Sequence, residues 1–365
     1  MNRPPLHLPN AEFRARLKRL LACQKRLRLD AVLLVTETNL YYFTGLETSN
    51  GLLLSGPEDG PAFHTDFRYL TMARRQAPWL SSRPLWRPAD EQSVLAGLGQ
   101  DWRRIGYEGR MGAERFLRWQ KALPHVEWVD VSSAVAELRS VKSRAEQQAM
   151  RNAVAANDQL FAALMQQTVP GMSEWDIRSL VRREADLLGQ GEAFNTIACV
   201  GRNGAECHHR PDGTVLKRGQ PLLVDLGLRL NHYCADMTRC VFFGKPTPLY
   251  RELHAVVHTA NRKAVRAIRP GVACRDIDAV ARGHIEKAGY GKYFGHGLGH
   301  GLGLEVHESP SFSSACGTVL KPGMVLTVEP GIYLPGKIGL RLEDVIVVTR
   351  TGCEVLTRTP HALTV

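Results

Sequence analysis

Long hydrophobic runs are missing from this sequence of 365 residues. It has no stretch of 18 or more uncharged apolar residues, and its first twenty residues, MNRPPLHLPNAEFRARLKRL, contain no apolar segment of the kind found in export signals. A bilayer-spanning helix needs about 20 such residues, and a secretory signal needs an apolar stretch of about 7–15. We therefore expect a cytoplasmic protein without a membrane partner.

Paired cysteines are missing as well. The eight cysteines, at positions 23, 199, 207, 234, 240, 274, 316 and 353, form no CxxC motif. A chain of this length can bury enough apolar surface to fold without disulfide bonds. The thiols are therefore expected to be reduced and mostly buried.

Two common ligand motifs are incomplete. A dinucleotide-binding loop needs a third glycine after Gly295 and Gly297, but His300 stands at that place. An HExxH zinc site needs a second histidine four residues after His307, where Ser311 stands. Neither kind of site is expected here.

The composition is that of a globular protein with an excess of basic residues. Hydrophobic residues make up 44% and charged residues 23%, and 47 Lys and Arg against 36 Asp and Glu give a net charge of +11. Part of the excess lies in FRARLKRLLACQKRLR, residues 13–28, where leucines recur at near-helical spacing. A surface helix with a solvated basic face is favoured over a binding patch, because a run of charges alone is a weak signal. We expect no specific nucleic-acid partner.

The pattern of the sequence changes near residue 135. Before it, short strand-like runs alternate with helical stretches, which is typical of an α/β domain; the runs lie at 31–36, 41–46, 51–56 and 126–131. After it, a Ser143-x-x-Glu146 capping box opens a long predicted helix over 143–167. Further helices are predicted at about 173–189, 248–268 and 274–288, and strands within 195–244 and 323–349.

Two aspartates interrupt a predicted hairpin, LLVDLGLRLNHYCADMTRCVFF, at residues 222–243. If the turn is centred between Leu230 and Asn231, Asp225 and Asp236 become cross-strand partners with Cβ atoms about 4.5–5.5 Å apart. Like charges at this spacing are destabilising unless a cation lies between them. The pair therefore predicts a metal site.

Two glutamates repeat this arrangement in LTVEPGIYLPGKIGLRLEDVIVV, residues 326–348. Glu329 and Glu343 are symmetric about Gly336, and Pro335-Gly336 is typical of a turn. Solvated surface acids are the competing interpretation, but both glutamates interrupt runs that are typical of buried strands. A β-bulge in either hairpin would change the partners.

Three histidines, His296, His300 and His307, lie within twelve residues in HGLGHGLGLEVHESP. A lone histidine is more often structural, but three beside two pairs of acids favour a functional site. Four carboxylates would balance about two divalent cations, and ligation by oxygen with a single imidazole suits Mn²⁺, with Co²⁺ or Zn²⁺ as alternatives.

At these motifs the sequence resembles the M24 metallopeptidases, and in particular their Xaa-Pro branch, which includes aminopeptidase P and prolidase. The resemblance covers nearly the whole chain. It implies a creatinase-like α/β domain at 1–134 and an α+β pita-bread catalytic domain at 135–365, with a curved antiparallel sheet and covering helices. It also implies five metal ligands, which fall on Asp225, Asp236, His300, Glu329 and Glu343.

The resemblance further implies catalytic roles. Glu329 would hold the attacking water and pass its proton to the proline nitrogen. His208 and His307 would stabilise the oxyanion as donors, with His209 as a weaker substitute for His208.

Other positions match residues near the substrate and the metals. His296 is implied to contact the substrate, and Tyr333 and Arg341 to lie near the metal site, although Tyr333 is equally consistent with a core aromatic. Arg341 and Glu343 are two residues apart and are expected on one face of one strand. The implied cofactor is a pair of divalent ions bridged by Asp236 and Glu343, which would activate a water near neutral pH.

The expected reaction is hydrolysis of the Xaa-Pro bond at the N-terminus of a proline-containing peptide, by a homo-oligomer that is a dimer or a tetramer. Prolidases commonly place an arginine soon after HExP to hold a dipeptide's carboxylate, whereas residues 307–315 read HESPSFSSA. An Xaa-Pro aminopeptidase is therefore favoured over an Xaa-Pro dipeptidase, although another loop or a partner subunit could supply the clamp. The long N-terminal segment disfavours a methionine aminopeptidase, and the complete ligand set disfavours a creatinase or an inactive pita-bread binding module.

Overall fold

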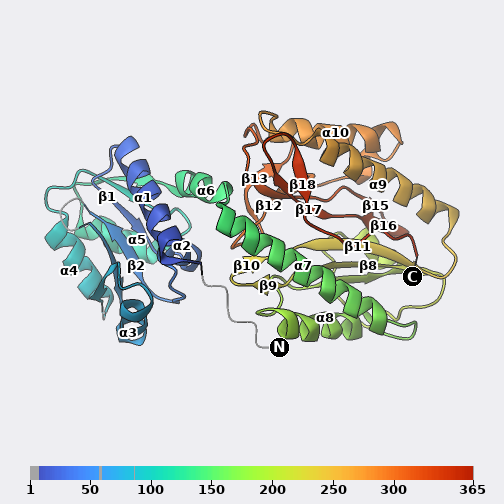
Figure 1. Ribbon diagram of the computed structural model, residues 1–365, viewed down its shortest axis with the longest axis horizontal. Helices are drawn as coiled ribbons and strands as arrows, with labels where there is room; N and C mark the ends of the chain where they lie inside the picture. Colours follow the sequence, from blue (N-terminus) through green and yellow to red (C-terminus); the bar gives the residue numbers. More distant parts are fainter. Residues whose placement is uncertain (1–7, 57–59, 86, 365) are drawn as a thin grey trace. The chain divides into compact units, whose positions relative to one another are not determined.

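The computed structural model describes residues 8–56, 60–85 and 87–364. The chain divides into two compact units, one ending at Arg139 and the other beginning at Ser140 (Figure 1). The boundary expected after residue 134 falls inside a single helix, α6 (Ser132–Ser140). The change of unit therefore comes at the end of that helix.

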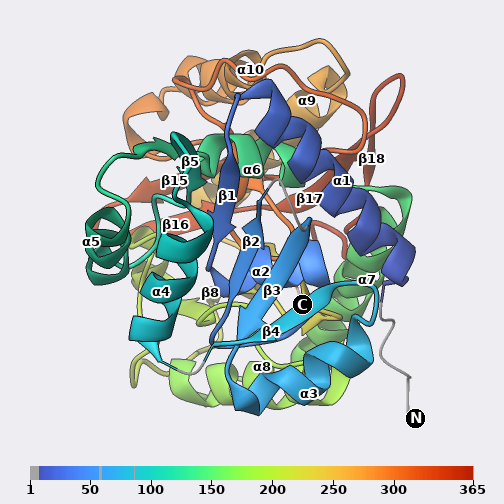
Figure 2. The same ribbon diagram turned by 90° about the vertical axis from the view of Figure 1, so that its left-hand side faces the viewer.

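The N-terminal unit is built on a mixed six-stranded sheet with the order β4-β3-β2-β1-β5-β6. Figure 2 shows strands β1 to β4 of this sheet side by side. The central strand β1 pairs antiparallel with β2 and parallel with β5, which confirms the expected α/β class. The strands are β1 (Ala31–Leu34), β2 (Leu52–Ser55), β3 (Pro61–Thr65), β4 (Ser81–Pro84), β5 (Arg104–Tyr107) and β6 (Glu127–Asp130). The helices before α6 are α1 (Asn10–Arg26), α2 (Glu37–Thr44), α3 (Phe67–Gln76), α4 (Pro88–Leu98) and α5 (Ala113–Ala122).

One predicted strand, at 41–46, is wrong, because these residues form the end of helix α2 and its cap. The apolar run is buried on all sides, and periodicity cannot distinguish a buried helix from a buried strand in so short a run. Gly45 ends the helix in the left-handed region, with φ of +75°. A side chain there would also meet the Phe13 ring, since a Cβ would lie 2.6 Å from it.

The basic segment at 13–28 forms most of α1, and its face is only partly solvated. Arg14, Lys18 and Lys25 are exposed, but the Arg16 side chain is fully buried. The Arg16 guanidinium donates to the Tyr42 carbonyl at 3.0 Å and lies over the Tyr42 ring. The expectation of a solvated basic face is therefore wrong at Arg16, which anchors α1 to α2.

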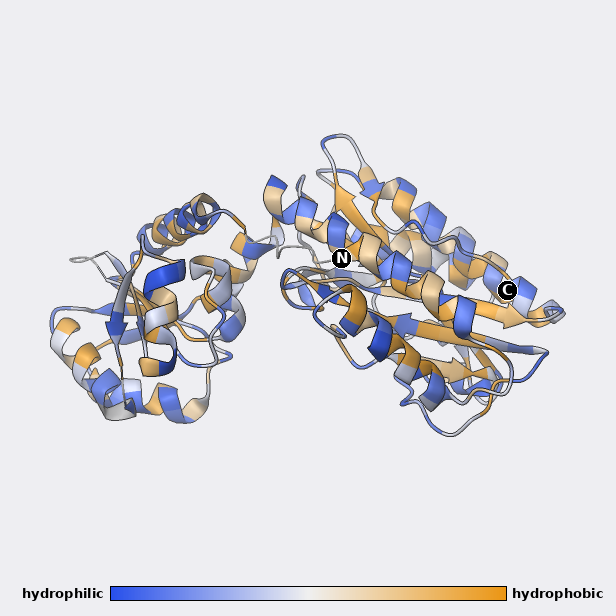
Figure 3. Ribbon diagram, turned by 60° about the horizontal axis from the view of Figure 1, so that its bottom comes forward, coloured by the Kyte–Doolittle hydropathy of each residue, from blue (hydrophilic) through white to orange (hydrophobic). Residues whose placement is uncertain are grey.

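The second unit consists of curved antiparallel strands covered by two helix pairs, which confirms the expected pita-bread architecture. Helices α7 and α8 pack on the sheet β11-β8-β7, while α9 and α10 share a core with the sheet β13-β12-β14-β17-β18 and the ribbon β15-β16. In Figure 3 the strands of this unit are mainly hydrophobic, and the helices alternate in hydropathy as amphipathic covering helices do. The helices are α7 (Arg144–Gln167), α8 (Glu174–Leu188), α9 (Pro248–Ala267) and α10 (Cys274–Lys287), with short 3-10 turns η1 (Gly201–Ala205) and η2 (Gly291–Tyr293).

Most strands of this unit lie within the predicted regions, but β12 and β13 begin in the histidine-rich stretch and β18 lies beyond the region predicted to end at residue 349. The strands are β7 (Ile197–Val200), β8 (Gln220–Leu226), β9 (Arg229–Leu230), β10 (Tyr233–Cys234), β11 (Met237–Phe243), β12 (Gly299–Gly301), β13 (Glu308–Phe312), β14 (Val325–Val328), β15 (Gly331–Leu334), β16 (Ile338–Arg341), β17 (Asp344–Val348) and β18 (Cys353–Val355). The predicted capping box of α7 is confirmed, because the Ser143 side chain accepts from the Glu146 N–H and the Glu146 carboxylate from the Ser143 N–H.

The turn of the first hairpin is centred one residue later than predicted, which changes the register of the strands. Asp225 faces Thr238 rather than Asp236, which lies between β10 and β11. The turn is centred on Asn231 and His232, which have φ of +51° and +69°. A two-residue hairpin turn with positive φ at both central residues matches strand twist, and Asn tolerates that conformation far better than Leu does.

The register of the second hairpin is confirmed. Leu334 pairs with Ile338, and beyond the ribbon Val328 pairs with Asp344, so the chain is symmetric about Gly336 as predicted. Glu343, however, lies between β16 and β17, so the expectation that Arg341 and Glu343 share one strand is wrong.

All eight cysteines are free thiols, and most of them are buried, as expected. No helix in the described ranges combines the length and the apolar character that a bilayer crossing requires.

Candidate active site

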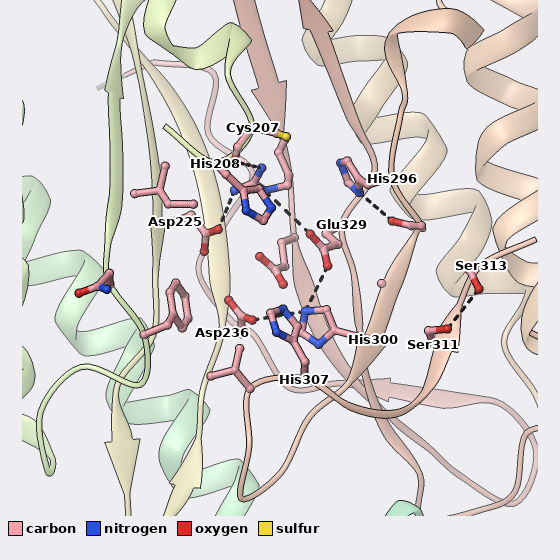
Figure 4. A pocket seen from close by; sticks show the side chains of 18 residues that line it. Cys207, His208, Asp225, Asp236, His296, His300, His307, Ser311, Ser313 and Glu329 are labelled. Carbon is pink, nitrogen blue, oxygen red and sulfur yellow. Dashed lines mark hydrogen bonds and ion pairs between the residues drawn. The ribbon is translucent and has the colours of Figure 1, made fainter. Parts of the chain in front are cut away.

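A cavity of about 480 Å³ opens in the second unit (Figure 4). Ten residues were given a metal, catalytic or substrate role from the sequence, and nine of them line this cavity. The tenth, Tyr333, lies behind the wall and contacts two of the lining residues. The nine are Asp225, Asp236, His300, Glu329, Glu343, His208, His296, His307 and Arg341.

The five ligand-type residues reach the cavity from both sheets of the unit. Asp225 is on β8 and Asp236 directly precedes β11, while His300 is on β12, Glu329 follows β14 and Glu343 precedes β17. The sequence wrongly paired the two aspartates across the hairpin, but both still line the cavity.

The glycines around His300 are required by close backbone approach. A Cβ at Gly299 would lie 2.1 Å from the Thr327 carbonyl oxygen, and one at Gly301 would lie 2.7 Å from that of Glu308. Strand β12 therefore fits between its neighbours only because His300 is flanked by residues without side chains. This is the structural reason for the Gly-His-Gly pattern.

His300 directs one ring nitrogen at the acids. Its Nδ1 lies 3.1 Å from the Gly301 carbonyl, to which it must donate, and Nε2 lies 3.3 Å from Glu329 Oε1 and 3.6 Å from Asp236 Oδ2. Ligand atoms of Asp236, His300 and Glu343 all lie within 4.8 Å of one another. A single divalent cation fits such a group of oxygen and imidazole ligands.

Burial makes the negative charges in this cavity unfavourable. Burial and the neighbouring Glu343 carboxylate raise the pKa of Asp236 well above its usual range, and burial and Glu329 do the same to the pKa of Glu343. Burial also raises the pKa of Asp225, which Arg341 only partly opposes. A cation among the acids would offset this penalty.

Glu329 and His300 behave differently because they pair with each other. Burial alone would raise the pKa of Glu329, but the hydrogen bond and charge of His300 outweigh it and lower that pKa. Burial works against the charged form of His300, yet the hydrogen bond and charge of Glu329 raise its pKa to about 9. Of the four acids, Glu329 is the one whose ionised form the surrounding protein favours.

Two oxygens in the cavity wall lack a partner of their own. Asp225 Oδ1 and Glu343 Oε1 are buried, and neither accepts a hydrogen bond from any residue that the structure describes. A buried acceptor without a partner costs about 1–3 kcal/mol. Both atoms belong to ligand-type residues, so the residues present fit a divalent metal.

Arg341 connects the ligand-type residue Asp225 to the Tyr333 hydroxyl behind the cavity wall. Its Nη2 lies 2.6 Å from Asp225 Oδ2, and its Nη1 donates to the Tyr333 hydroxyl at 2.8 Å. His296 Nδ1 donates to the Gly297 carbonyl at 2.7 Å, so the Tyr333 hydroxyl, 2.9 Å away, donates to His296 Nε2. Burial lowers the pKa of His296, which is consistent with this neutral form. Tyr333 is thus a hydrogen-bonding group as well as a core aromatic.

Sequence reasoning missed two threonines that orient the acids. The Thr238 hydroxyl donates to Glu343 Oε2 at 2.7 Å and accepts from Arg341 Nε at 2.9 Å. The Thr327 hydroxyl donates to Glu329 Oε1 at 3.2 Å and accepts the His300 N–H at 3.0 Å. Thr238 lies two residues after Asp236 and Thr327 two before Glu329, but each acid lies just outside the strand of its threonine, so the two-residue period of strands does not identify either threonine. Among the other wall residues, the following carry no signal in the sequence: Phe194, Asn195, Ile197, Val306, Ser311 and Ser313.

The two adjacent histidines of AECHHRP point to different places. His208 lines the cavity, whereas His209 bonds to Glu174 at 2.8 Å on the other side of its segment. On the far wall, His307 packs edge-on against His300, with ring centroids 4.4 Å apart. Burial and the nearby His300 lower the pKa of His307.

A second group of ligand-type residues, Glu174, His209 and Asp212, also lies within 4.8 Å. Each Glu174 oxygen already accepts two hydrogen bonds. Oε1 accepts from Val200 and Asn203, and Oε2 accepts from His209 and Asp212. A metal would have to break these bonds, so this group is a hydrogen-bond network.

Comparison with known proteins gives a consistent result. Residues 148–350 match metallopeptidase family M24, and residues 16–141 match the Creatinase/Prolidase N-terminal domain. The chain is 30% identical over 353 residues to a Xaa-Pro dipeptidase from Pyrococcus furiosus, covering 96% of this chain and 100% of the relative.

Solved structures of similar proteins cover nearly the whole chain. A Xaa-Pro dipeptidase from Bacillus anthracis superposes with a TM-score of 0.91 and 30% identity, covering 97% of this chain and 100% of the other. An X-Pro aminopeptidase from Thermotoga maritima gives a TM-score of 0.86 with 32% identity, covering 94% and 100%.

Proposed function

The chain belongs to metallopeptidase family M24, in the branch that contains the Xaa-Pro peptidases, and from this premise we propose that it is a divalent-metal Xaa-Pro dipeptidase. The observation that carries the proposal is the convergence of five ligand-type side chains on one cavity, two of them with buried oxygens that no described residue satisfies.

The choice of a dipeptidase departs from the expectation formed on the sequence. That expectation favoured an aminopeptidase because no arginine follows HESP. The dipeptidases of P. furiosus and B. anthracis match this chain over almost their full lengths, and this supports the dipeptidase reading.

An Xaa-Pro aminopeptidase is the second candidate, and a local feature favours it. Among the described residues that line the cavity, Arg341 is the only arginine, and its guanidinium is engaged by Asp225, Tyr333 and Thr238. A dipeptide's carboxylate would therefore need a cation from outside this wall. The T. maritima X-Pro aminopeptidase shares the fold.

The proposed cofactor is a pair of divalent ions held by Asp225, Asp236, His300, Glu329 and Glu343, with Mn²⁺ expected and Co²⁺ or Zn²⁺ as alternatives. Bound there, the ions would supply Lewis-acid polarisation of the scissile carbonyl and activation of water near neutral pH. Asp236 and Glu343, whose pKa values burial raises, gain most from such cations.

The protein's own groups would move the protons. Glu329 would accept a proton from the attacking water and pass it to the proline nitrogen as the C–N bond breaks. His208 and His307, which both line the cavity, would donate hydrogen bonds to the oxyanion. His296, held by Tyr333, would contact the substrate.

Substrate choice would follow from shape. Proline has a fixed φ and, within a peptide bond, no N–H, so a site fitted to its ring can exclude other residues. Phe194, Ile197 and Val306 give the cavity apolar surface on which such a ring can pack.

The test is release of proline from Ala-Pro by protein loaded with Mn²⁺, Co²⁺ or Zn²⁺ in turn. We expect rapid release with at least one metal, loss of activity on chelation, and little hydrolysis of Ala-Ala. Failure to release proline from Ala-Pro with all three metals would contradict the proposal. Homo-oligomeric assembly and the absence of a specific nucleic-acid partner stay predictions from the sequence.

A further inference from the structure

We propose that Glu174, which lies outside the cavity, positions His208 for the reaction by anchoring the segment that carries it. The proposal rests on the proposed function, in which His208 donates to the oxyanion. Glu174 is the first residue of α8 and its side chain is fully buried.

Glu174 uses both carboxylate oxygens on the segment around His208. Oε1 accepts from the Val200 N–H at 2.7 Å and from Asn203 Nδ2 at 2.9 Å. Oε2 accepts from His209 Nε2 at 2.8 Å and from the Asp212 N–H at 2.9 Å. One carboxylate therefore ties down points both before and after His208.

The two neighbours of His208 are each held by a different residue. Arg341 Nη1 donates to the carbonyl of Cys207 at 3.4 Å, and the His209 ring is bound by Glu174. Because the residue before and the residue after are both fixed, the backbone of His208 has little freedom. Its imidazole is thereby directed into the cavity, where Figure 4 shows it near Asp225 and Glu329.

Direct backbone contact adds a third anchor. Gly204 in η1 lies so close to Gly339 of β16 that a Cβ at Gly339 would be 1.6 Å from the Gly204 carbonyl oxygen. The segment therefore packs against the strand that carries Arg341. Glu174 holds the same segment by its four hydrogen bonds.

Burying a carboxylate is costly, and here the buried charge holds a backbone segment and does not bind a ligand. Four hydrogen bonds satisfy the charge, and its place at a helix N-terminus favours it further. Donors fixed before the substrate arrives stabilise a transition state better than mobile ones. Glu174 would thus act on the reaction through His208.

The experiment is a double-mutant cycle on the metal-loaded enzyme with His208→Ala, Glu174→Gln and both changes together. His208→Ala should lower kcat by about 10²-fold. Glu174→Gln, which turns one acceptor into a donor that faces other donors, should lower kcat by about ten-fold or more, with metal content unchanged. In the double variant, Glu174→Gln should add no further loss, because the group through which it acts is gone.

Glu146→Gln is the matched control. Glu146 is another buried carboxylate, bonded to Tyr233 and Ser143 away from the cavity, and this change should leave kcat near that of the parent. His209 gives an independent check if Glu174→Gln fails to fold. His209→Gln keeps a donor for Glu174 and should retain most activity, whereas His209→Leu should lose it to the same extent as Glu174→Gln.

The two ways of failing are distinguishable. A silent His208→Ala would remove the donor role itself and with it the positioning role of Glu174. Suppose instead that His208→Ala loses much of its kcat. The positioning role would then be overturned if Glu174→Gln alone left kcat unchanged, or if the loss in the double variant equalled the product of the two single losses. Either result would leave the proposed function intact.

Discussion

Arg341 and Asp225 form an ion pair in the wall of the cavity, with 2.6 Å between Nη2 and Oδ2. The pair uses only one oxygen of the aspartate, and the other, Oδ1, is buried without a partner among the described residues. Asp225 is therefore held by the protein on one side and is available to a ligand on the other. Its pKa, raised by burial, shows that one guanidinium does not offset the cost of its charge.

Removing the guanidinium should therefore destabilise the protein most when no metal is bound. Arg341→Met leaves a buried carboxylate without its countercharge, and we expect the free energy of unfolding in chelator to fall by about 3–5 kcal/mol. Saturating Mn²⁺ should reduce the loss, because the cation replaces the missing charge. Urea unfolding with and without Mn²⁺ measures both values.

Arg151→Met is the control for that experiment. Arg151 pairs with Glu354 at a half-exposed site, and its loss should cost about 1 kcal/mol or less, with or without metal. If Mn²⁺ failed to reduce the loss in Arg341→Met, Asp225 would not be a metal ligand.

Substitutions at the adjacent acids Glu343 and Asp344 should differ sharply in their effect on metal content. Glu343→Gln and Asp236→Asn each remove a proposed ligand carboxylate, so bound metal should fall from about two ions per chain toward none. Asp344→Asn is the control, because Asp344 bonds to Arg239 and His361 and not to the cavity residues. Elemental analysis after dialysis gives the counts. A full complement of metal in Glu343→Gln would contradict the dinuclear assignment.

The Thr238 hydroxyl should tune metal affinity without being a ligand. Thr238→Val keeps the shape of the side chain but removes its bonds to Glu343 and Arg341. Loss of an orienting partner of a ligand typically weakens metal binding by 10- to 100-fold, and we expect a shift of about this size. Thr238→Ser keeps the hydroxyl and should stay near the parent. Mn²⁺ titrations of activity compare the three proteins, and equal affinities would show that the hydroxyl has no such role.

Stability should depend on pH through His209. Burial works to lower the pKa of His209, but hydrogen bonds to Glu174 and Glu206 outweigh it and raise that pKa above 6.5. A raised folded-state pKa means that the contribution to stability is fully present below about pH 6.5 and is lost as the pH rises through the folded value. The difference in unfolding free energy between the parent and His209→Gln should thus shrink from pH 6 toward pH 9. The measurements are made in chelator, so that metal release does not contribute to the difference. A difference that grew with pH would contradict the raised pKa of His209.

Local signals explain what the sequence could predict. Pro335-Gly336 fixes the second hairpin locally, so the symmetric placement of Glu329 and Glu343 could be read directly. The first hairpin was misplaced because its turn depends on left-handed backbone at Asn231 and His232, which the sequence marks only weakly. The residues at 41–44 are helical because tertiary packing decides so short an apolar run.

Long-range relationships account for what the sequence could not predict. Glu174 meets Asn203, His209 and Asp212 only after α8 has packed beside the strands, and nothing near position 174 indicates it. The contact between Gly204 and Gly339 is of the same kind, since each glycine alone resembles an ordinary loop residue. The four acids were easier to predict, because each interrupts an apolar strand pattern, whereas His300 was singled out from three histidines by the resemblance to the M24 family.

The most direct test of the account is the ratio of kcat/KM on Ala-Pro to that on Ala-Pro-Ala, measured with one metal and at one pH. A dipeptidase holds the free carboxylate next to the proline, and the ratio should favour Ala-Pro by about ten-fold or more, the size expected for about 1.4 kcal/mol of added binding in the transition state. A ratio that favours Ala-Pro-Ala by a similar factor would contradict the dipeptidase assignment and would establish the aminopeptidase, with the carboxylate clamp absent from this cavity.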